Sequence, residues 1–235
     1  MTPNSVVPEI LYNLIYCIDN LKCFKDGVKI LNQILDKDPY NELVWLELGK
    51  LNLELNKTKN ALNSFDYAIL CDDKFSAAYV EKAKLLQKNN SFLEAIENYQ
   101  FSLTLESPSA YIYLRIGECF KMLRKHSLEM KYYKLSVKED PNYEESWIAL
   151  IEFYINKKNL KSALMYCKKA LKINENYPEY WVLYAKINKY LNKFVAAEEA
   201  FKNIIGLGIV ELKSWSGWID MLISQSKWEK GYQIG

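Results

Sequence analysis

The sequence has little of what catalytic, metal and nucleotide sites are built from. It contains one histidine, His126, and its cysteines form no Cys-x-x-Cys pair. Gly206-Leu207-Gly208 is the one glycine-rich stretch, and no Lys-Ser or Lys-Thr pair follows it. A hydrolase triad requires a base, a zinc site usually requires paired ligands, and a phosphate loop requires that lysine. We therefore predict a chain without catalytic activity, cofactor or metal, in which His126 is a partly packed turn residue.

Charge of one sign and long apolar runs are also missing. The formal net charge is +2, and only Arg115 and Arg124 among the 31 lysines and arginines are arginines, whereas nucleic-acid binders usually concentrate positive charge. No apolar run reaches membrane-spanning length, and residues 1–20 lack the basic segment of a secretory signal. The five cysteines are odd in number, which fits thiols in a reducing compartment better than disulfides. We predict a soluble, cytoplasmic protein without nucleic-acid or membrane partners.

The chain repeats itself with a period of 34 residues, which is typical of a helical repeat protein. A large residue of the first expected helix of each unit recurs at Leu11, Trp45, Tyr79, Tyr113, Trp147, Trp181 and Trp215. Four residues later, small residues stand at Gly49, Ala83, Gly117 and Ala185. In the second expected helix a small residue recurs at Gly27, Ala61, Ala95, Ala163, Ala197 and Gly231, with Glu129 as the exception. A ring follows it at Phe65, Tyr99, Tyr133 and Phe201.

The repeated residues predict a helical hairpin. Each unit has two amphipathic stretches with apolar residues three and four apart, separated by a short polar turn such as residues 56–59. Gly49 and Ala61 let two helix backbones approach closely, and the rings of Trp45 and Phe65 cover the gap. We therefore assign the tryptophans to packing rather than to a ligand cage. No hairpin of this size buries its apolar face alone, so each must pack against its neighbours.

These residues resemble the tetratricopeptide repeat family, whose pattern is Trp-x2-Leu-Gly-x2-Tyr, then Ala-x3-Phe-x2-Ala, then Pro. The resemblance covers nearly the whole chain, in frames 8-41, 42-75, 76-109, 110-143, 144-177 and 178-211 and a partial frame 212-235. It implies an all-α fold, a right-handed superhelical solenoid of antiparallel helix hairpins with about 6.5 repeats, forming a single array over 1-235. Because the last frame is incomplete and has no capping helix, we expect the natural protein to be longer.

In this family the first helices line a concave groove, and the resemblance implies that frame positions 2, 5, 6, 9, 12 and 13 point into it. These positions supply basic, acidic and tyrosine side chains that suit a peptide of mixed charge. The predicted peptide-binding residues are Tyr12, Tyr16, Lys50, Lys84, Lys88, Tyr111, Arg115, Glu118, Lys121, Glu152, Lys186 and Lys189. The alternative is a solvated helix surface without a ligand, since charges are expected at exposed helix positions.

The repeats predict a protein–protein interaction scaffold that binds a peptide or protein in this groove. Chaperone-binding members of the family grip a C-terminal carboxylate with a set of Lys, Asn and Arg positions. No three consecutive frames supply that set, so we do not expect chaperone tails to bind. Two alternatives stay open: a non-catalytic targeting or regulatory arm of a larger enzyme, and a helical-repeat RNA binder. The acidic groove positions Glu81, Glu118 and Glu152 argue against an RNA backbone track.

Overall fold

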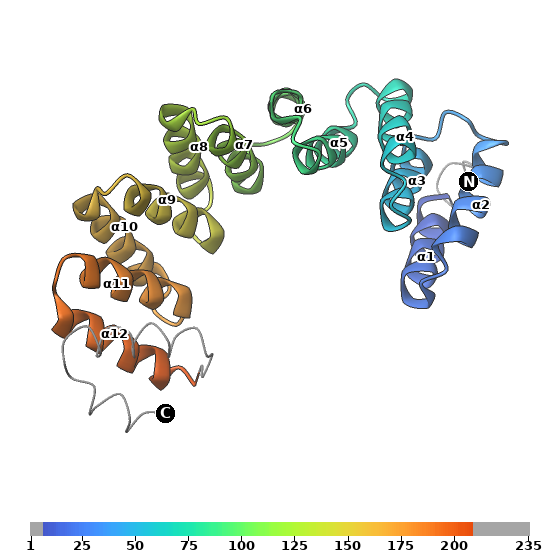
Figure 1. Ribbon diagram of the computed structural model, residues 1–235. Coiled ribbons are helices and arrows are strands. Elements are labelled where there is room, and N and C mark those ends of the chain that lie inside the picture. Colours follow the sequence, from blue (N-terminus) through green and yellow to red (C-terminus); the bar gives the residue numbers. More distant parts are fainter. Residues whose placement is uncertain (1–6, 209–235) are drawn as a thin grey trace. The chain divides into compact units, whose positions relative to one another are not determined.

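The computed structural model describes residues 7–208, and this part of the chain contains helices only. The helices pair as hairpins, α1 with α2 and so on to α11 with α12 (Figure 1). Their bounds are α1 Val7–Leu21, α2 Phe24–Leu35, α3 Glu42–Glu54, α4 Thr58–Cys71, α5 Ser76–Lys88, α6 Phe92–Leu105, α7 Ala110–Met122, α8 His126–Glu139, α9 Glu144–Asn156, α10 Leu160–Ile173, α11 Pro178–Tyr190 and α12 Phe194–Gly206. The all-α hairpin fold predicted from the repeats is confirmed. The partial frame 212-235 lies outside the described residues.

The described residues form two compact units, 7–108 with 118–125 and 109–117 with 126–208. Each unit has its own core. In the first unit Leu31 and Phe65 are fully buried, each in an apolar cluster, and in the second unit Leu150 and Ile151 are fully buried in another cluster. The prediction that the repeats form a single array over 1-235 stays a prediction.

The end of each first helix repeats the same backbone geometry every 34 residues. The residues other than glycine with a positive φ, between 51° and 64°, are Lys22, Asn56, Asn90, Arg124, Lys158 and Asn192. The amide of the following residue donates to a carbonyl five residues earlier, as from Lys57 to Asn52 at 2.8 Å and from Asn159 to Tyr154 at 2.9 Å. This left-handed cap satisfies carbonyls that the helix end would leave unpaired. It reverses the chain between the two helices of a hairpin.

A glycine substitution at Lys158 would test whether the left-handed conformation of the cap is strained. A side chain in the left-handed region brings Cβ close to the next carbonyl oxygen, a strain that glycine does not have. We expect Lys158→Gly to raise the free energy of unfolding by about 0.5–1 kcal/mol, after the greater freedom of glycine in the unfolded chain is subtracted. The neighbouring Lys157 has φ −82°, so Lys157→Gly should lower the free energy of unfolding by a similar amount. Urea unfolding would measure both, and a loss in Lys158→Gly would contradict the strain argument.

The small residues and rings of the repeat meet as the sequence predicts. A Cβ atom on Gly49 would lie 2.6 Å from Cδ1 of Phe65, and one on Gly117 would lie 2.6 Å from Cδ1 and Cε1 of Tyr133. Both rings are buried, with 0% of Phe65 and 2% of Tyr133 exposed. The first and second helices of these hairpins therefore approach until a ring touches the backbone of the facing helix.

The large residue of the first helix holds the turn that precedes it. The indole Nε1 of Trp45 donates to the Pro39 carbonyl at 2.8 Å, and that of Trp147 donates to the Pro141 carbonyl at 2.8 Å. The Tyr79 hydroxyl makes the equivalent bond to the Asp73 carbonyl at 3.1 Å. Each bond spans six residues, so it closes the loop that enters the helix. These rings belong to the scaffold, as predicted.

Candidate functional site

The second unit presents a continuous surface made by its first helices. Helix α7 is joined to α9 by an ion pair from Arg115 to Glu145, and α9 packs directly against α11. We call the exposed side of these helices the first-helix face. It contains five of the predicted peptide-binding residues: Tyr111, Arg115, Glu152, Lys186 and Lys189.

Arg115 is the centre of an ordered group on this face. Its guanidinium lies 4.9 Å from the centre of the Tyr111 ring, and its Nη2 donates to Oε2 of Glu145 at 3.4 Å. The Tyr143 hydroxyl donates to the same Oε2 at 2.9 Å. Burial, and then the Glu145 carboxylate, raise the pKa of Tyr143 to about 12, so its hydroxyl keeps its proton at neutral pH. The Tyr111 ring, the Arg115 guanidinium and the Glu145 carboxylate are thus held together at the surface without a ligand.

Glu145 is not among the twelve predicted peptide-binding residues, although it stands at position 2 of frame 144-177, which the family resemblance places in the groove. Its side chain is 55% exposed, against 28% for Arg115. A ligand carboxylate could therefore compete for the guanidinium, and a ligand cation could approach Glu145. The sequence does contain a signal for this contact. Glu145 lies 30 residues after Arg115, so it stands one helical turn before the position equivalent to Arg115 in the next repeat.

A pocket of about 430 Å³ lies near the other end of the same face. Its lining residues are Ile155, Asn156, Lys158, Leu160, Lys186 and Tyr190. Tyr190 is 55% exposed and supplies a ring, while Lys186 supplies a cation. Lys189 and Glu152 are half-buried on the neighbouring turns of α11 and α9. The pocket has room for one apolar side chain beside a negatively charged group.

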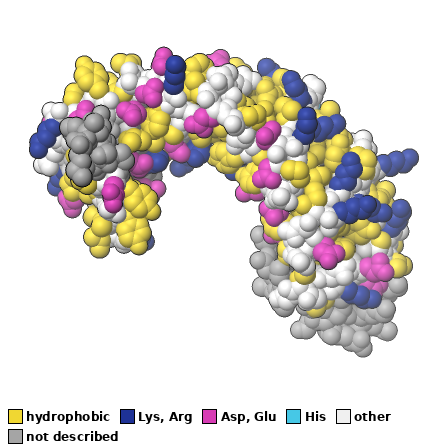
Figure 2. Space-filling view, turned by 180° about the vertical axis from the view of Figure 1, so that it is seen from behind, with side chains coloured by type: hydrophobic (Ala, Val, Ile, Leu, Met, Phe, Trp, Pro, Cys, Tyr) yellow, Lys and Arg dark blue, Asp and Glu magenta, His cyan; other side chains and the backbone are white. Residues whose placement is uncertain are grey.

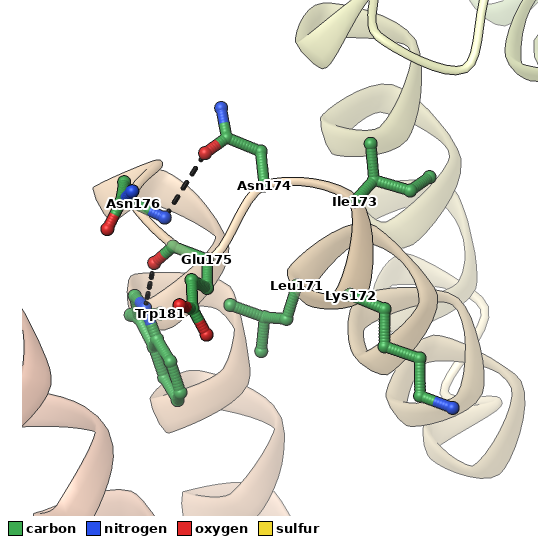
Figure 3. A pocket seen from close by; sticks show the side chains of 7 residues that line it. All are labelled: Leu171, Lys172, Ile173, Asn174, Glu175, Asn176 and Trp181. Atoms are coloured by element: carbon green, nitrogen blue, oxygen red, sulfur yellow. Dashed lines mark hydrogen bonds between the residues drawn. The ribbon is translucent and has the colours of Figure 1, made fainter.

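A second pocket, of about 500 Å³, lies at the turn between α10 and α11 (Figure 3). Its lining belongs to the turn that Trp181 holds, because the Trp181 indole donates to the Glu175 carbonyl at 2.7 Å. The backbone amide of Asn176 donates to Oδ1 of Asn174 at 3.1 Å, and Nδ2 of Asn174 donates to Oε1 of Glu144 at 3.3 Å. The polar groups in this pocket serve the turn, so we assign it to the scaffold.

In the first unit the predicted basic groove residues carry acidic neighbours. Lys50 pairs with Glu47 at 2.8 Å and Lys84 pairs with Glu81 at 2.7 Å, each one turn apart on the same helix. Such exposed pairs are worth little for stability, but they reduce the local positive charge. Lys88 and Lys121 are exposed.

The other predicted residues of this unit differ in their surroundings. Glu118 accepts from Nε2 of Gln87 at 3.1 Å, and Oε1 of Gln87 accepts from the Tyr99 hydroxyl at 3.1 Å. Tyr12 and Tyr16 are 71% and 62% exposed on α1. The first unit therefore offers two exposed rings on α1 and a hydrogen-bonded carboxylate.

Residues 7–208 contain no cluster of three or more His, Cys, Asp or Glu side chains that could hold a metal ion. His126 is about half exposed, and its Nδ1 lies 3.0 Å from Oε2 of Glu129. Glu129 is the exception at the small-residue position, and it is buried at 4% exposure with its carboxylate beside His126. Burial raises the pKa of the Cys167 thiol to about 12, which keeps it protonated and unreactive near neutral pH. No helix in this part of the chain is both long and apolar enough to span a bilayer.

Residues 145–177 match the family described as tetratricopeptide repeat. Over 113 residues the chain is 27% identical to the transcription factor tau 131 kDa subunit of Saccharomyces cerevisiae. This match covers 46% of the chain and 11% of that protein. Over 132 residues it is 25% identical to the general transcriptional corepressor ssn6 of Schizosaccharomyces pombe, covering 54% of the chain and 12% of that protein. The chain thus spans about a ninth of the length of these relatives.

Solved structures share the fold over most of the chain. The type IV pilus biogenesis factor PilW has a TM-score of 0.67 and 22% identity, covering 84% of this chain and 92% of that one. YrrB, described as a TPR protein with an unusual peptide-binding site, has a TM-score of 0.58 and 15% identity, covering 75% of this chain and 91% of that one. At these identities the similarity establishes the fold alone.

Proposed function

We propose that the chain, in which residues 145–177 match the tetratricopeptide repeat family, is a non-catalytic scaffold that binds a segment of a partner protein on the first-helix face. The ordered Arg115 group carries this proposal. A guanidinium held between a tyrosine ring and a carboxylate has lost its freedom before binding, so a ligand that uses it pays less entropy. Arginine and tyrosine are also the residue types that dominate binding energy at interfaces.

The two ends of the face suit different parts of one peptide. The pocket of Ile155 and Tyr190 suits an apolar anchor with an acidic neighbour near Lys186, and Glu145 suits a basic residue. The peptide-binding site named for YrrB supports this use of the fold, and the description of the yeast tau 131 kDa protein as a subunit supports a role within a larger assembly. Because none of the five cysteines forms a disulfide, we also propose a reducing, cytoplasmic location.

A displayed random-peptide library selected on the intact chain would test the face. We expect enriched peptides with mixed charge, whose affinity falls at least about tenfold in Arg115→Ala, because a central anchoring side chain is lost. Arg115→Lys should recover only part of the affinity, since lysine keeps the charge but not the planar group over Tyr111. Affinities would be measured by titration calorimetry.

Lys25→Ala is the matched control, because it removes one exposed cation from α2 in the first unit. It should leave the affinity unchanged. Peptides that bind Arg115→Ala and Tyr190→Ala as tightly as the unsubstituted chain would show that the first-helix face is not the binding surface.

A further inference from the structure

The second helices of the second unit carry a concentration of lysines that the first-helix face does not use. On α8 the exposed lysines are Lys131, Lys134 and Lys138, and on α10 they are Lys161, Lys168, Lys169 and Lys172. The three lysines of α8 are three and four residues apart, and Lys161, Lys168 and Lys172 of α10 are seven and four residues apart, which places each set along one side of its helix, with Lys169 next to Lys168 at the edge of that side. The opposite sides are packed: α8 buries Tyr133 and α10 buries Cys167. We call these seven residues the lysine face.

The general abundance of lysine in the chain does not explain this distribution. Helices α8 and α10 together carry seven lysines and two glutamates, and one of the glutamates, Glu129, is buried against His126. The other four second helices, α2, α4, α6 and α12, together carry four lysines and six carboxylates. A compositional bias would have affected all six helices alike. Figure 2 shows lysine and arginine side chains gathered over the second unit, at the right of that view.

Side chains between the helices join the two rows into one surface. The hydroxyls of Tyr154 on α9 and, to a smaller extent, Tyr166 on α10 raise the pKa of Lys134 on α8, which stabilises its charged form. The Tyr154 and Tyr166 rings stack with their centres 5.2 Å apart. The ammonium of Lys169 lies 5.5 Å from the centre of the Tyr166 ring. The tyrosines therefore hold some of the lysines in place while leaving their charges exposed.

None of the seven lysines has a carboxylate within ion-pairing distance in the part of the chain that the structure describes. This differs from the first unit, where Lys50 and Lys84 are paired on their own helices. Rows about 10 Å long on α8 and about 16 Å long on α10 thus form a positive surface, in which Glu139 beside Lys138 is the exposed carboxylate of these two helices. Such a surface attracts negatively charged partners and accelerates their association.

We propose that the lysine face binds an acidic segment of a partner protein, separately from the ligand of the first-helix face. The chemistry of the face favours carboxylates over the other polyanions. It carries no arginine to form bidentate contacts with phosphates, and its tyrosine rings lie beneath lysines or are buried, so bases could not stack on them. Met165 and Ile173 are the large apolar residues of α10 that are exposed, which is too little for insertion into a membrane.

The intact chain and a fluorescein-labelled peptide of alternating glutamate and serine would test the lysine face. We expect binding in low salt that weakens as salt shortens the range of the charges, and no binding of the same peptide with glutamine in place of glutamate. The triple variant Lys131→Gln, Lys168→Gln, Lys172→Gln should bind roughly tenfold more weakly, because three exposed charge contacts are lost. Fluorescence anisotropy would measure the affinities.

A control variant with Lys25→Gln, Lys59→Gln and Lys74→Gln removes the same charge from exposed positions of the first unit. It should bind the acidic peptide as tightly as the unsubstituted chain. An equal loss in both triple variants would mean that net charge alone is responsible, and the lysine face would be rejected. Tighter binding of oligouridylate, or of vesicles of phosphatidylserine and phosphatidylcholine, through the same three lysines would also overturn the assignment to an acidic polypeptide.

Discussion

Gly49→Ala should destabilise the first unit even though alanine is the better helix former. The change gains about 1 kcal/mol of helix propensity. The added Cβ, however, would lie 2.6 Å from Cδ1 and 3.0 Å from Cζ of Phe65, a ring that is fully buried and cannot swing into solvent. Overpacking of this kind costs about 1–3 kcal/mol, and three ring atoms are affected here. We expect a net loss of about 2 kcal/mol in the free energy of unfolding.

Gly206 supplies the matched control at the end of α12. A Cβ atom at this position would have no other atom within 4 Å, so Gly206→Ala should be neutral or stabilising by up to about 1 kcal/mol. Phe65→Leu should be less costly in the Gly49→Ala background than alone, because the smaller side chain leaves room for the methyl group. Urea unfolding of the four chains gives this coupling. Equal effects of Gly49→Ala and Gly206→Ala would show that the ring contact does not limit the hairpin.

Trp147→Ala should produce the largest loss of stability among the tryptophan substitutions in the described residues. Trp147 is 5% exposed and belongs to the buried apolar cluster of the second unit that contains Leu150 and Ile151, whereas Trp45 and Trp181 are half-buried. Removing a buried indole costs about 3–5 kcal/mol, from lost burial and from the cavity that remains. Since stability in repeat proteins depends mainly on neighbouring repeats, the loss should be concentrated around α9. Hydrogen exchange would show faster exchange in α8, α9 and α10 than in α3 and α4.

Trp147→Phe separates the packing of this ring from its hydrogen bond. It keeps most of the buried surface but loses the donor to the Pro141 carbonyl, which is exposed and can bind water instead. We expect a loss of about 1 kcal/mol for the hydrogen bond, with a further small contribution from the reduced ring size. A small effect of Trp147→Ala would instead favour a surface role for this tryptophan.

The fold could be predicted because packing positions recur. Gly49 with Phe65 and Gly117 with Tyr133 are local pairs within one hairpin, and their spacing alone indicates the contact. The backbone of the turn was harder to foresee. Asparagine at three of the left-handed positions is a usual signal, but Lys22, Arg124 and Lys158 are not, so only the period reveals them.

The candidate site could be predicted less well than the fold. The pairs Glu47–Lys50 and Glu81–Lys84 are visible in the sequence at helical spacing, and their effect on the basic stretch could have been anticipated. The Arg115 group depends on how α7 and α9 pack, since Glu145 and Arg115 lie on different helices. The lysine face was not predicted, because the predicted groove is lined by first helices only. The excess of lysine on α8 and α10 over the other second helices is nevertheless present in the sequence.

The left-handed caps also bear on how such a chain can change its length. Because the cap recurs every 34 residues, cutting at the same point in two repeats and joining the ends would reproduce a cap with its hydrogen bonds intact. A deletion or duplication of one whole repeat preserves the phase of every following helix. A change of another length inside a helix would rotate the residues that follow, so that part of their buried side would face solvent. Unequal recombination at equivalent helix positions would therefore yield folded products that differ by whole hairpins.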